Sequence, residues 1–444
     1  MSPPRDLPDA VNAALYGTSH VTTDVRNVWY PLLVDHELPR KASEARPMAA
    51  RLLGEPLVLF RDEENRPRCL ADRCPHKNAK LSVGRVRQGK MECFYHGWQF
   101  DSRNGKVDCI PFLLPGRSIP PQAQTKSYPC VEKYHLIWVW PGESQADESL
   151  IPWYPEFSDE KANFWGRSNE CPVDASLWLE NLMDLAHTPF AHDGQFASRE
   201  QGRPLKYHTK ATKGGLVAET EFFGAPESDP KQSTEWVAPI TSIVSVKFPG
   251  GTWLRLHFYS VPMAPGACRF IMTLYRDWGY LLQKAMDAAE WFPPLRAMVA
   301  QMDMTVPFQD MISMTGQARN MKEGCPPLSV PIQCDEMAVH FRRWWGKAFT
   351  RDVWWKGWNG KMDMEDMTES ALQACFGADA CGQYERDITF AANSGGSRNC
   401  RPYVDRWATT HYKRSPFESS WWSTFALVLS AGLAGAAFTA LSRR

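Results

Sequence analysis

Cys74-Pro75-His76 and Cys93-Phe94-Tyr95-His96 are the two short motifs that decide the fold of this 444-residue chain. Each motif holds one cysteine and one histidine, and sixteen residues separate His76 from Cys93. Each motif can occupy a single loop, with strands in the intervening segment that bring the two loops together. The sequence therefore predicts a small β domain that presents two thiols and two imidazoles side by side.

The mixed pairing of ligands indicates which metal group these loops bind. In a Rieske [2Fe–2S] centre two thiolates hold one iron and two imidazoles hold the other. Zinc is the alternative, since two Cys and two His also satisfy Zn²⁺, but zinc fingers pair Cys with Cys. No further cysteine follows His76 or His96 directly, so the bracing disulfide of high-potential centres is not expected. We predict a low-potential cluster held by Cys74, His76, Cys93 and His96, the type that suits an oxygenase.

A second group of potential ligands lies in NLMDLAHTPFAH, residues 181–192. Asn181, Asp184 and His187 are three residues apart and would share one helix face. His192 follows His187 by five residues, so an uninterrupted helix would turn it away by about 140°. Pro189 between them breaks a helix and lets both imidazoles face one metal. Two histidines and one carboxylate, with the opposite positions open, form the site of Fe(II) oxygenases.

The carboxylate must come from elsewhere in the chain. Asp310 in VPFQDMISMTGQ (306–317) is the best candidate, near the start of a helix that Pro307 can open. Asp303 is the alternative. Asp184 is better placed to orient an imidazole and relay electrons or protons, and we assign it and Asn181 catalytic roles. The competing interpretation of Asp184 is an ordinary surface acid or helix cap.

The remaining sequence indicates an α+β chain. We expect an arm at 1–25, an all-β Rieske domain at 26–142, and a mixed catalytic domain at 150–410 that would bind the mononuclear iron. Lys plus Arg and Asp plus Glu number 50 each, so no concentrated positive surface for nucleic acid is expected. No dinucleotide loop or P-loop is present, so the chain lacks the usual site for its own nicotinamide or flavin.

The C-terminal stretch predicts a membrane anchor. Residues 421–442 contain no charge, open on two tryptophans and are followed by two arginines. That length and those flanks are typical of one transmembrane helix. A buried amphipathic helix packed on the domain is the alternative.

With both motifs in place, the chain resembles the pheophorbide a oxygenase family of Rieske non-haem iron oxygenases, which act in chlorophyll metabolism and are related to chlorophyllide a oxygenase. The similarity covers roughly residues 26–320 and includes the segments NVWYPLL, CPHKNAKLSVGRV, CFYHGWQFD, LENLMDLAHTPFAH, VPMAPG and QDMISMTGQ. The resemblance implies a Rieske domain followed by a helix-grip (START-like) catalytic domain, with Asp310 as the third iron ligand.

The resemblance also implies partners and a location. These are a ferredoxin or similar electron donor, O₂, a tetrapyrrole substrate, plastid or cyanobacterial membranes, and a head-to-tail homotrimer.

The sequence departs from the family pattern in a segment linked to regulation: Ser415 and Glu418 stand where relatives carry a redox Cys-x-x-Cys. A sterol or another hydrophobic ring is the alternative substrate for the same chemistry. A membrane-bound electron carrier of the Rieske type is the alternative of another class, and it would need no His187/His192/Asp310 site.

Overall fold

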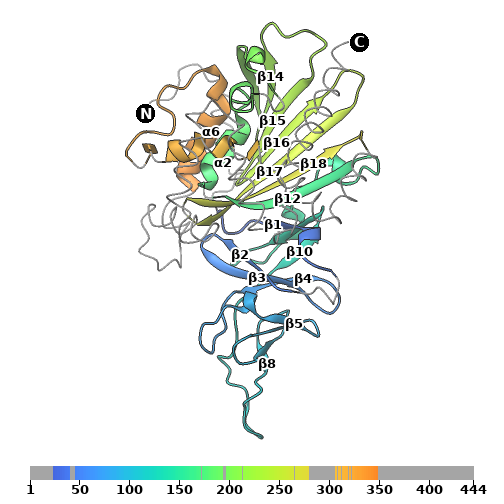
Figure 1. Cartoon of the computed structure of the whole chain (residues 1–444), viewed down its shortest axis with the longest axis vertical. Helices are drawn as coiled ribbons and strands as arrows, with labels where there is room; N and C mark the ends of the chain where they lie inside the picture. Colours follow the sequence, from blue (N-terminus) through green and yellow to red (C-terminus); the bar gives the residue numbers. More distant parts are fainter. Residues whose placement is uncertain are drawn as a thin grey trace, which may run out of the picture.

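The structure is a computed structural model that describes residues 24–40, 46–279 and 306–348, apart from residues 172, 194–196, 213, 265, 308, 312, 319 and 322. Within these residues the chain forms two regions that Figure 1 shows one above the other. The predicted arm up to residue 23, Asp303, Ser415, Glu418 and the predicted anchor at 421–442 lie outside the described residues. Among the described residues, no helix is long and apolar enough to span a membrane.

The N-terminal region consists of three small antiparallel sheets, as the short apolar runs of the sequence predict. The first sheet has the order β1-β11-β10, the second β2-β3-β4-β9 and the third β5-β6-β7-β8. Their bounds are β1 Tyr30–Val34, β2 Met48–Leu52, β3 Glu55–Arg61, β4 Pro67–Ala71, β5 Arg85–Arg87, β6 Lys90–Glu92, β7 Gln99–Phe100, β8 Val107–Cys109, β9 Ser127–Tyr128, β10 Cys130–Lys133 and β11 Leu136–Val139. The third sheet lies at the far end of the molecule from the C-terminal region (Figure 1).

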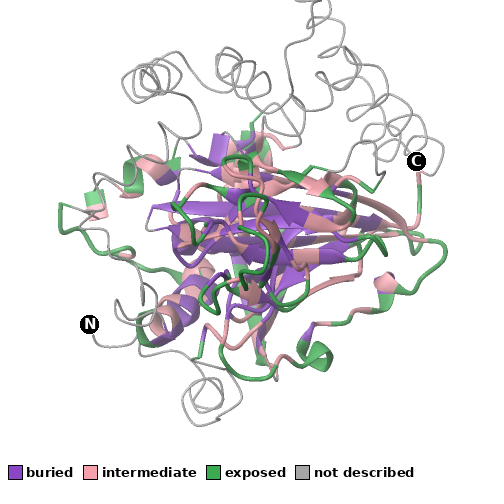
Figure 2. Cartoon of the chain, turned by 90° about the horizontal axis from the view of Figure 1, so that it is seen from below, coloured by how far each residue is buried: buried purple, intermediate pink, exposed green. Residues whose placement is uncertain are grey.

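The C-terminal region is built on one seven-stranded antiparallel sheet with the order β12-β18-β17-β16-β15-β14-β13. The strands are β12 Asn163–Cys171, β13 Leu205–Ala211, β14 Gly215–Phe222, β15 Lys231–Val237, β16 Thr241–Lys247, β17 Trp253–Ala264 and β18 Ala267–Arg276. The buried residues gather in these strands and the exposed ones in the connecting loops (Figure 2). This confirms the predicted catalytic domain with a β-sheet core.

Helix α2 (Ala175–Met183) lies against one face of that sheet. Asp174 caps its N-terminus by accepting a hydrogen bond from the Ser176 N–H at 2.9 Å. Two buried strand serines bind its backbone, Ser260 to the carbonyl of Ala175 at 2.9 Å and Ser242 to that of Leu182 at 3.3 Å. Helix α6 (Glu336–Ala348) then packs on α2. These contacts fix the position of the C-terminal end of α2, where the second motif begins.

The two regions share one hydrophobic core. Trp138 of β11 meets Tyr259 of β17 edge to face, with ring centroids 5.8 Å apart. The Glu37 carboxylate accepts hydrogen bonds from the backbone and side chain of Ser168 in β12, at 2.9 and 2.6 Å. The N-terminal region therefore packs directly on the large sheet through its first sheet and Glu37, and the predicted domain boundaries at 142 and 150 stay predictions.

Candidate metal centres

The two Cys/His motifs adopt the same loop conformation. In both loops the cysteine N–H donates to the carbonyl five residues on, at 2.9 Å. The residue four positions after each cysteine, Asn78 or Gly97, has a left-handed backbone with φ of 57° or 69°. Its N–H returns to the carbonyl of Cys74 or Cys93 at 2.9 or 3.0 Å. Gly and Asn tolerate that conformation, which explains why these residue types close the loops.

The side chains of the two loops converge in the way that a mixed cluster needs. Cys74 and Cys93 are each 2% exposed, whereas His76 and His96 lie at the surface with ring centroids 4.5 Å apart. Trp98 stacks on His76 at 4.7 Å and limits how that imidazole can turn. Burial, with the neighbouring Cys93 thiol, raises the pKa of the Cys74 thiol. Two neighbouring buried thiols and two neighbouring imidazoles nearer the surface are the donor set of a Rieske-type [2Fe–2S] cluster.

The second motif does not form the single helix face that the sequence predicts. α2 ends at Met183, Asp184 is extended, and a new four-residue helix α3 (Thr188–Ala191) follows His187. Tyr207 of β13 holds the break, because its hydroxyl donates to the Met183 carbonyl and accepts from the Leu185 N–H, both at 3.0 Å. The expectation of one face was wrong, since Pro189 starts α3 instead of bending α2.

The two histidines of the second motif nevertheless meet one carboxylate. The Asp310 Oδ1 atom lies 3.3 Å from His187 Nε2 and 3.2 Å from His192 Nε2. One potential ligand atom from each of the three residues lies within 4.8 Å of the others. His192 is 2% exposed and Asp310 6%, so the centre is shielded from water. Such a group can hold one metal ion and leave other coordination positions open.

The histidines and carboxylates of this centre shift one another's pKa values. Burial opposes the cationic form of His187, but the nearby Asp184 and Asp310 carboxylates outweigh it and raise the pKa of the imidazole to about 10. Burial likewise opposes the charged form of Asp310, yet His187 and His192 lower the pKa of its carboxyl group. The carboxylate is therefore ready to bind a cation at neutral pH.

Gln309 is a member of this site that the sequence did not reveal. Its Oε1 atom lies 2.9 Å from Nδ1 of His192, and its side chain is 5% exposed. A carbonyl oxygen accepts from Nδ1–H and leaves the Nε2 lone pair directed at Asp310 and the metal position. Adjacent residues on a helix point about 100° apart, so the proximity of Gln309 and Asp310 in sequence did not predict that both reach the site.

Asn181 and Asp184 lie on different sides of the centre. The Asn181 amide donates to Asp310 Oδ1 at 3.4 Å and so steadies the carboxylate from the interior. The Asp184 Oδ2 atom lies 3.7 Å from Nδ1 of His187, beyond hydrogen-bond range. The Asp184 side chain is 36% exposed, compared with 20% for His187. Asp184 therefore occupies the solvent-facing side of the His187 ring, and that side of the site can be reached from outside.

Known proteins resemble this chain in both regions. Residues 28–129 match the Rieske [2Fe-2S] domain, and residues 172–351 match the vanillate O-demethylase oxygenase C-terminal domain. The chain is 30% identical to chlorophyllide a oxygenase of Chlamydomonas reinhardtii over 74% of its length and 49% of the relative. It is 26% identical to pheophorbide a oxygenase of Oryza sativa subsp. japonica, over 75% of its length and 66% of the relative.

The chain therefore combines a Rieske [2Fe-2S] domain with an oxygenase C-terminal domain, the composition of Rieske non-haem iron oxygenases, and the similarity to these two relatives is consistent with the predicted resemblance to the pheophorbide a oxygenase family. It spans between about half and two thirds of the length of these two relatives. The fold also matches dicamba monooxygenase bound to dicamba, with a TM-score of 0.61 and 22% identity, over 74% of this chain and 98% of that one.

The matched domains and the His187, His192 and Asp310 group imply two cofactors, a [2Fe–2S] cluster and a mononuclear iron. The residues present fit both groups. Cys74 and Cys93 are free, buried thiols rather than a disulfide. His187 Nδ1 is buried and has no hydrogen-bond partner among the described residues, while its Nε2 faces the shared carboxylate.

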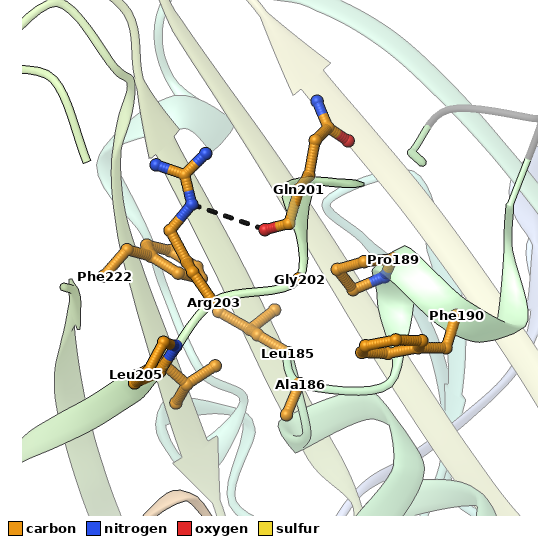
Figure 3. A pocket seen from close by; sticks show the side chains of 10 residues that line it. Leu185, Ala186, Pro189, Phe190, Gln201, Gly202, Arg203, Leu205 and Phe222 are labelled. Carbon is orange, nitrogen blue, oxygen red and sulfur yellow. Dashed lines mark hydrogen bonds between the residues drawn. The ribbon is translucent and has the colours of Figure 1, made fainter. Parts of the chain in front are cut away.

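A recess lies beside the iron-site segment of this oxygenase-family chain. It has a volume of about 300 Å³, and Figure 3 shows it between α3 and the start of β13. The walls are mostly apolar, with the Arg203 guanidinium bound to the Gln201 carbonyl at 3.3 Å on one side. None of the three metal-ligand candidates lines it; the lining residues are Leu185, Ala186, Pro189, Phe190, Gln201, Gly202, Arg203, Pro204, Leu205 and Phe222. The recess is therefore distinct from the metal centre.

Proposed function

We propose that this protein is a mono- or dioxygenase that uses O₂ and electrons from a ferredoxin-like donor to oxidise a hydrophobic ring substrate. The decisive observation is that one chain carries both the Cys/His loops and the convergent His187, His192 and Asp310 side chains. A Rieske electron carrier would need only the first of these sites. The second site gives the chain a place to activate O₂.

The ligand assignment follows from the donor positions. Cys74 and Cys93 would hold the inner iron of the cluster, His76 and His96 the outer one, and the buried triad would hold the mononuclear iron. When bound, these groups supply one-electron storage and O₂ activation. The protein contributes the geometry: Gln309 fixes the tautomer of His192, and Asn181 holds Asp310 in place.

A chlorophyll-derived tetrapyrrole is the substrate class that we infer. Two relatives that match along about three quarters of this chain are named chlorophyllide a oxygenase and pheophorbide a oxygenase. Both names describe oxidation of large, flat tetrapyrroles. A sterol or another hydrophobic ring is the alternative, and product analysis of the reconstituted protein with each class distinguishes them.

We infer that the chains assemble head to tail, as a homotrimer, so that each cluster faces the iron site of its neighbour. Two exposed apolar surfaces support this. One lies at the tips of the loops around the cluster, where Phe94 is 79% exposed, Tyr95 59% and Phe112 82%. The other lies by the recess, where Phe190 is 49% exposed. A contact between unlike surfaces that closes on itself gives a ring.

The location that we propose is a plastid or cyanobacterial membrane, with residues 421–442 as the anchor. The curated relatives named above are chloroplastic. The uncharged length of 421–442 is sufficient for one helix across a bilayer.

Metal content and spectroscopy test the proposed function. We expect three irons per chain and, after reduction, an EPR signal typical of mixed His/Cys ligation. His187→Ala should remove one iron and all turnover, and leave the cluster signal unchanged. Zinc at the Cys/His loops, with no such signal, would exclude the Rieske assignment.

A further inference from the structure

The cluster-binding end of the molecule carries a strong positive charge in a chain that is neutral as a whole. Residues 73–117 contain nine Lys and Arg against three Asp and Glu, whereas the whole chain has 50 of each. Glu92, one of the three acids, is buried; one of its carboxylate oxygens lies 2.6 Å from Arg85 and the other 3.9 Å from Arg87. Asp108 is paired with Lys90 at 2.6 Å. The positive charge at this end is therefore only partly neutralised.

Four of the basic residues lie in the segments that adjoin the cluster loops. Arg73 and Lys80 flank the first loop at the point where the Cys74 N–H meets the Ala79 carbonyl. Arg85 lies directly opposite Glu92, the residue before Cys93, in the β5–β6 pairing. We call Arg73, Lys80, Arg85 and Arg87 the basic collar; all four are exposed.

A buried contact brings the parts of the collar together. The Asp72 carboxylate accepts hydrogen bonds from the Ser82 N–H at 2.7 Å and from the Ser82 hydroxyl at 2.6 Å. This contact fixes residues 80–85 beside Arg73. Arg73 and Lys80 make no ion pair with any carboxylate in the described part of the chain, so their charge is available to a partner.

The recess side of a second copy's iron site is a poor match for this collar. The arginines there are already paired, Arg199 with Asp193 at 3.3 Å and Arg203 with Asp229 at 3.4 Å, so this surface has little excess negative charge. The apolar tips of the loops, with Phe94 and Tyr95, are separate from the base where the collar lies. The apolar tips can contact a neighbouring copy. The basic residues at the base remain available to a negatively charged partner.

We propose that the basic collar docks a small acidic one-electron carrier protein of the ferredoxin class next to the cluster loops. This inference rests on the proposed function, which requires such a donor but does not locate it. Clustered charge of one sign raises the rate of association with an opposite partner by about 10- to 1000-fold, and salt removes the gain. Because Arg73 immediately precedes Cys74, a carrier bound here lies beside a cluster ligand.

Charge reversal tests the collar. Arg73→Glu with Lys80→Glu changes two exposed residues that make no ion pair in the described part of the chain and are not cluster ligands. Lys231→Glu with Lys247→Glu is the matched control, since these exposed lysines are paired at the ends of the neighbouring inner strands β15 and β16. Rapid freeze-quench EPR would follow reduction of the Rieske cluster by a reduced acidic [2Fe–2S] ferredoxin. We expect a roughly tenfold lower second-order rate constant for the collar variant at low salt, a difference that disappears at high salt.

Two further measurements separate the possible failures. Reduced methyl viologen, a small cationic donor, should reduce the cluster in both variants at close to the unchanged rate. An unaltered ferredoxin rate in the collar variant would overturn the docking inference alone. Loss of the native oligomer in the collar variant would also overturn the docking inference, because it would show that the collar binds a second copy. Absence of any reducible Rieske signal in the unaltered protein would instead overturn the proposed function.

Discussion

At the scale of single residues, the orientation of His192 depends on Gln309. The 2.9 Å contact between Gln309 Oε1 and His192 Nδ1 is the hydrogen bond that selects the tautomer with a free Nε2. Loss of such an outer partner lowers metal affinity by about 10- to 100-fold in other metal sites. We expect Gln309→Ala to weaken Fe(II) binding by a factor in that range, measured by competition with a chelator.

The same helical segment offers a matched control. Gln317 is exposed, and its amide bonds only to Ser313 at 3.3 Å. Gln317→Ala should leave Fe(II) affinity unchanged. Equal affinity in Gln309→Ala and Gln317→Ala would show that Gln309 does not orient the iron ligand.

Much of the site was predictable from single residues because ligand chemistry restricts the choice. Mixed Cys/His pairs and a His-x₄-His around a proline have few other uses, and the structure brings His187, His192 and Asp310 together. Gln309 was not predictable, because glutamine is an ordinary helix residue and only the fold places it against His192. The sequence predicted that Asp184 lies near His187. It did not predict that 3.7 Å would separate the Asp184 Oδ2 atom from the His187 Nδ1 atom.

At the scale of elements, the break between α2 and α3 positions the iron ligands. The Tyr207 hydroxyl satisfies two backbone groups in this break, on Met183 and Leu185. Local spacing predicted a continuous helix up to Pro189, because three-residue intervals favour one helical face. The sequence could not show that a tyrosine from β13 would supply the hydrogen bonds that end α2 six residues before that proline.

Tyr207→Phe should therefore destabilise the catalytic region. It leaves a buried N–H and a buried carbonyl unpaired, and each such group costs about 1–3 kcal/mol. We expect a lower Tm by thermal denaturation and a smaller iron content per chain. Tyr134→Phe is the control, because the Tyr134 ring stacks on Phe157 and its hydroxyl makes no hydrogen bond to any residue that the structure describes. A Tm unchanged by Tyr207→Phe would mean that the break is stable without this contact.

At the scale of the whole molecule, membrane attachment should be separable from both metal centres. Every candidate metal ligand lies between residues 74 and 310, far in sequence from 421–442. Truncation before Trp421 should move the protein to the soluble fraction and leave its iron content and EPR signal unchanged. Persistence of the truncated chain in carbonate-washed membranes would show that another segment is the anchor.

The proposed ring makes a further prediction, because it requires electrons to cross between subunits. A Cys93→Ala chain lacks the cluster and a His187→Ala chain lacks the mononuclear iron, so each should be inactive alone. In a randomly mixed ring, a given junction joins an intact cluster to an intact iron site with a chance of about one in four. Co-expressed mixtures should therefore recover up to roughly a quarter of the unaltered activity.

Substitution of Asp184 tests whether electrons that cross between subunits pass through the relay that the sequence predicts at this residue. Asp184 lies on the exposed side of His187, so it should act only in the subunit that supplies the iron site. Asp184→Asn removes a charge and should abolish the recovered activity when it is placed in the Cys93→Ala chain. The same substitution in the His187→Ala chain should have no effect, because that chain supplies only the cluster. Equal loss from both placements would assign Asp184 a structural role, and mixed oligomers without any activity would show that electrons stay within one subunit.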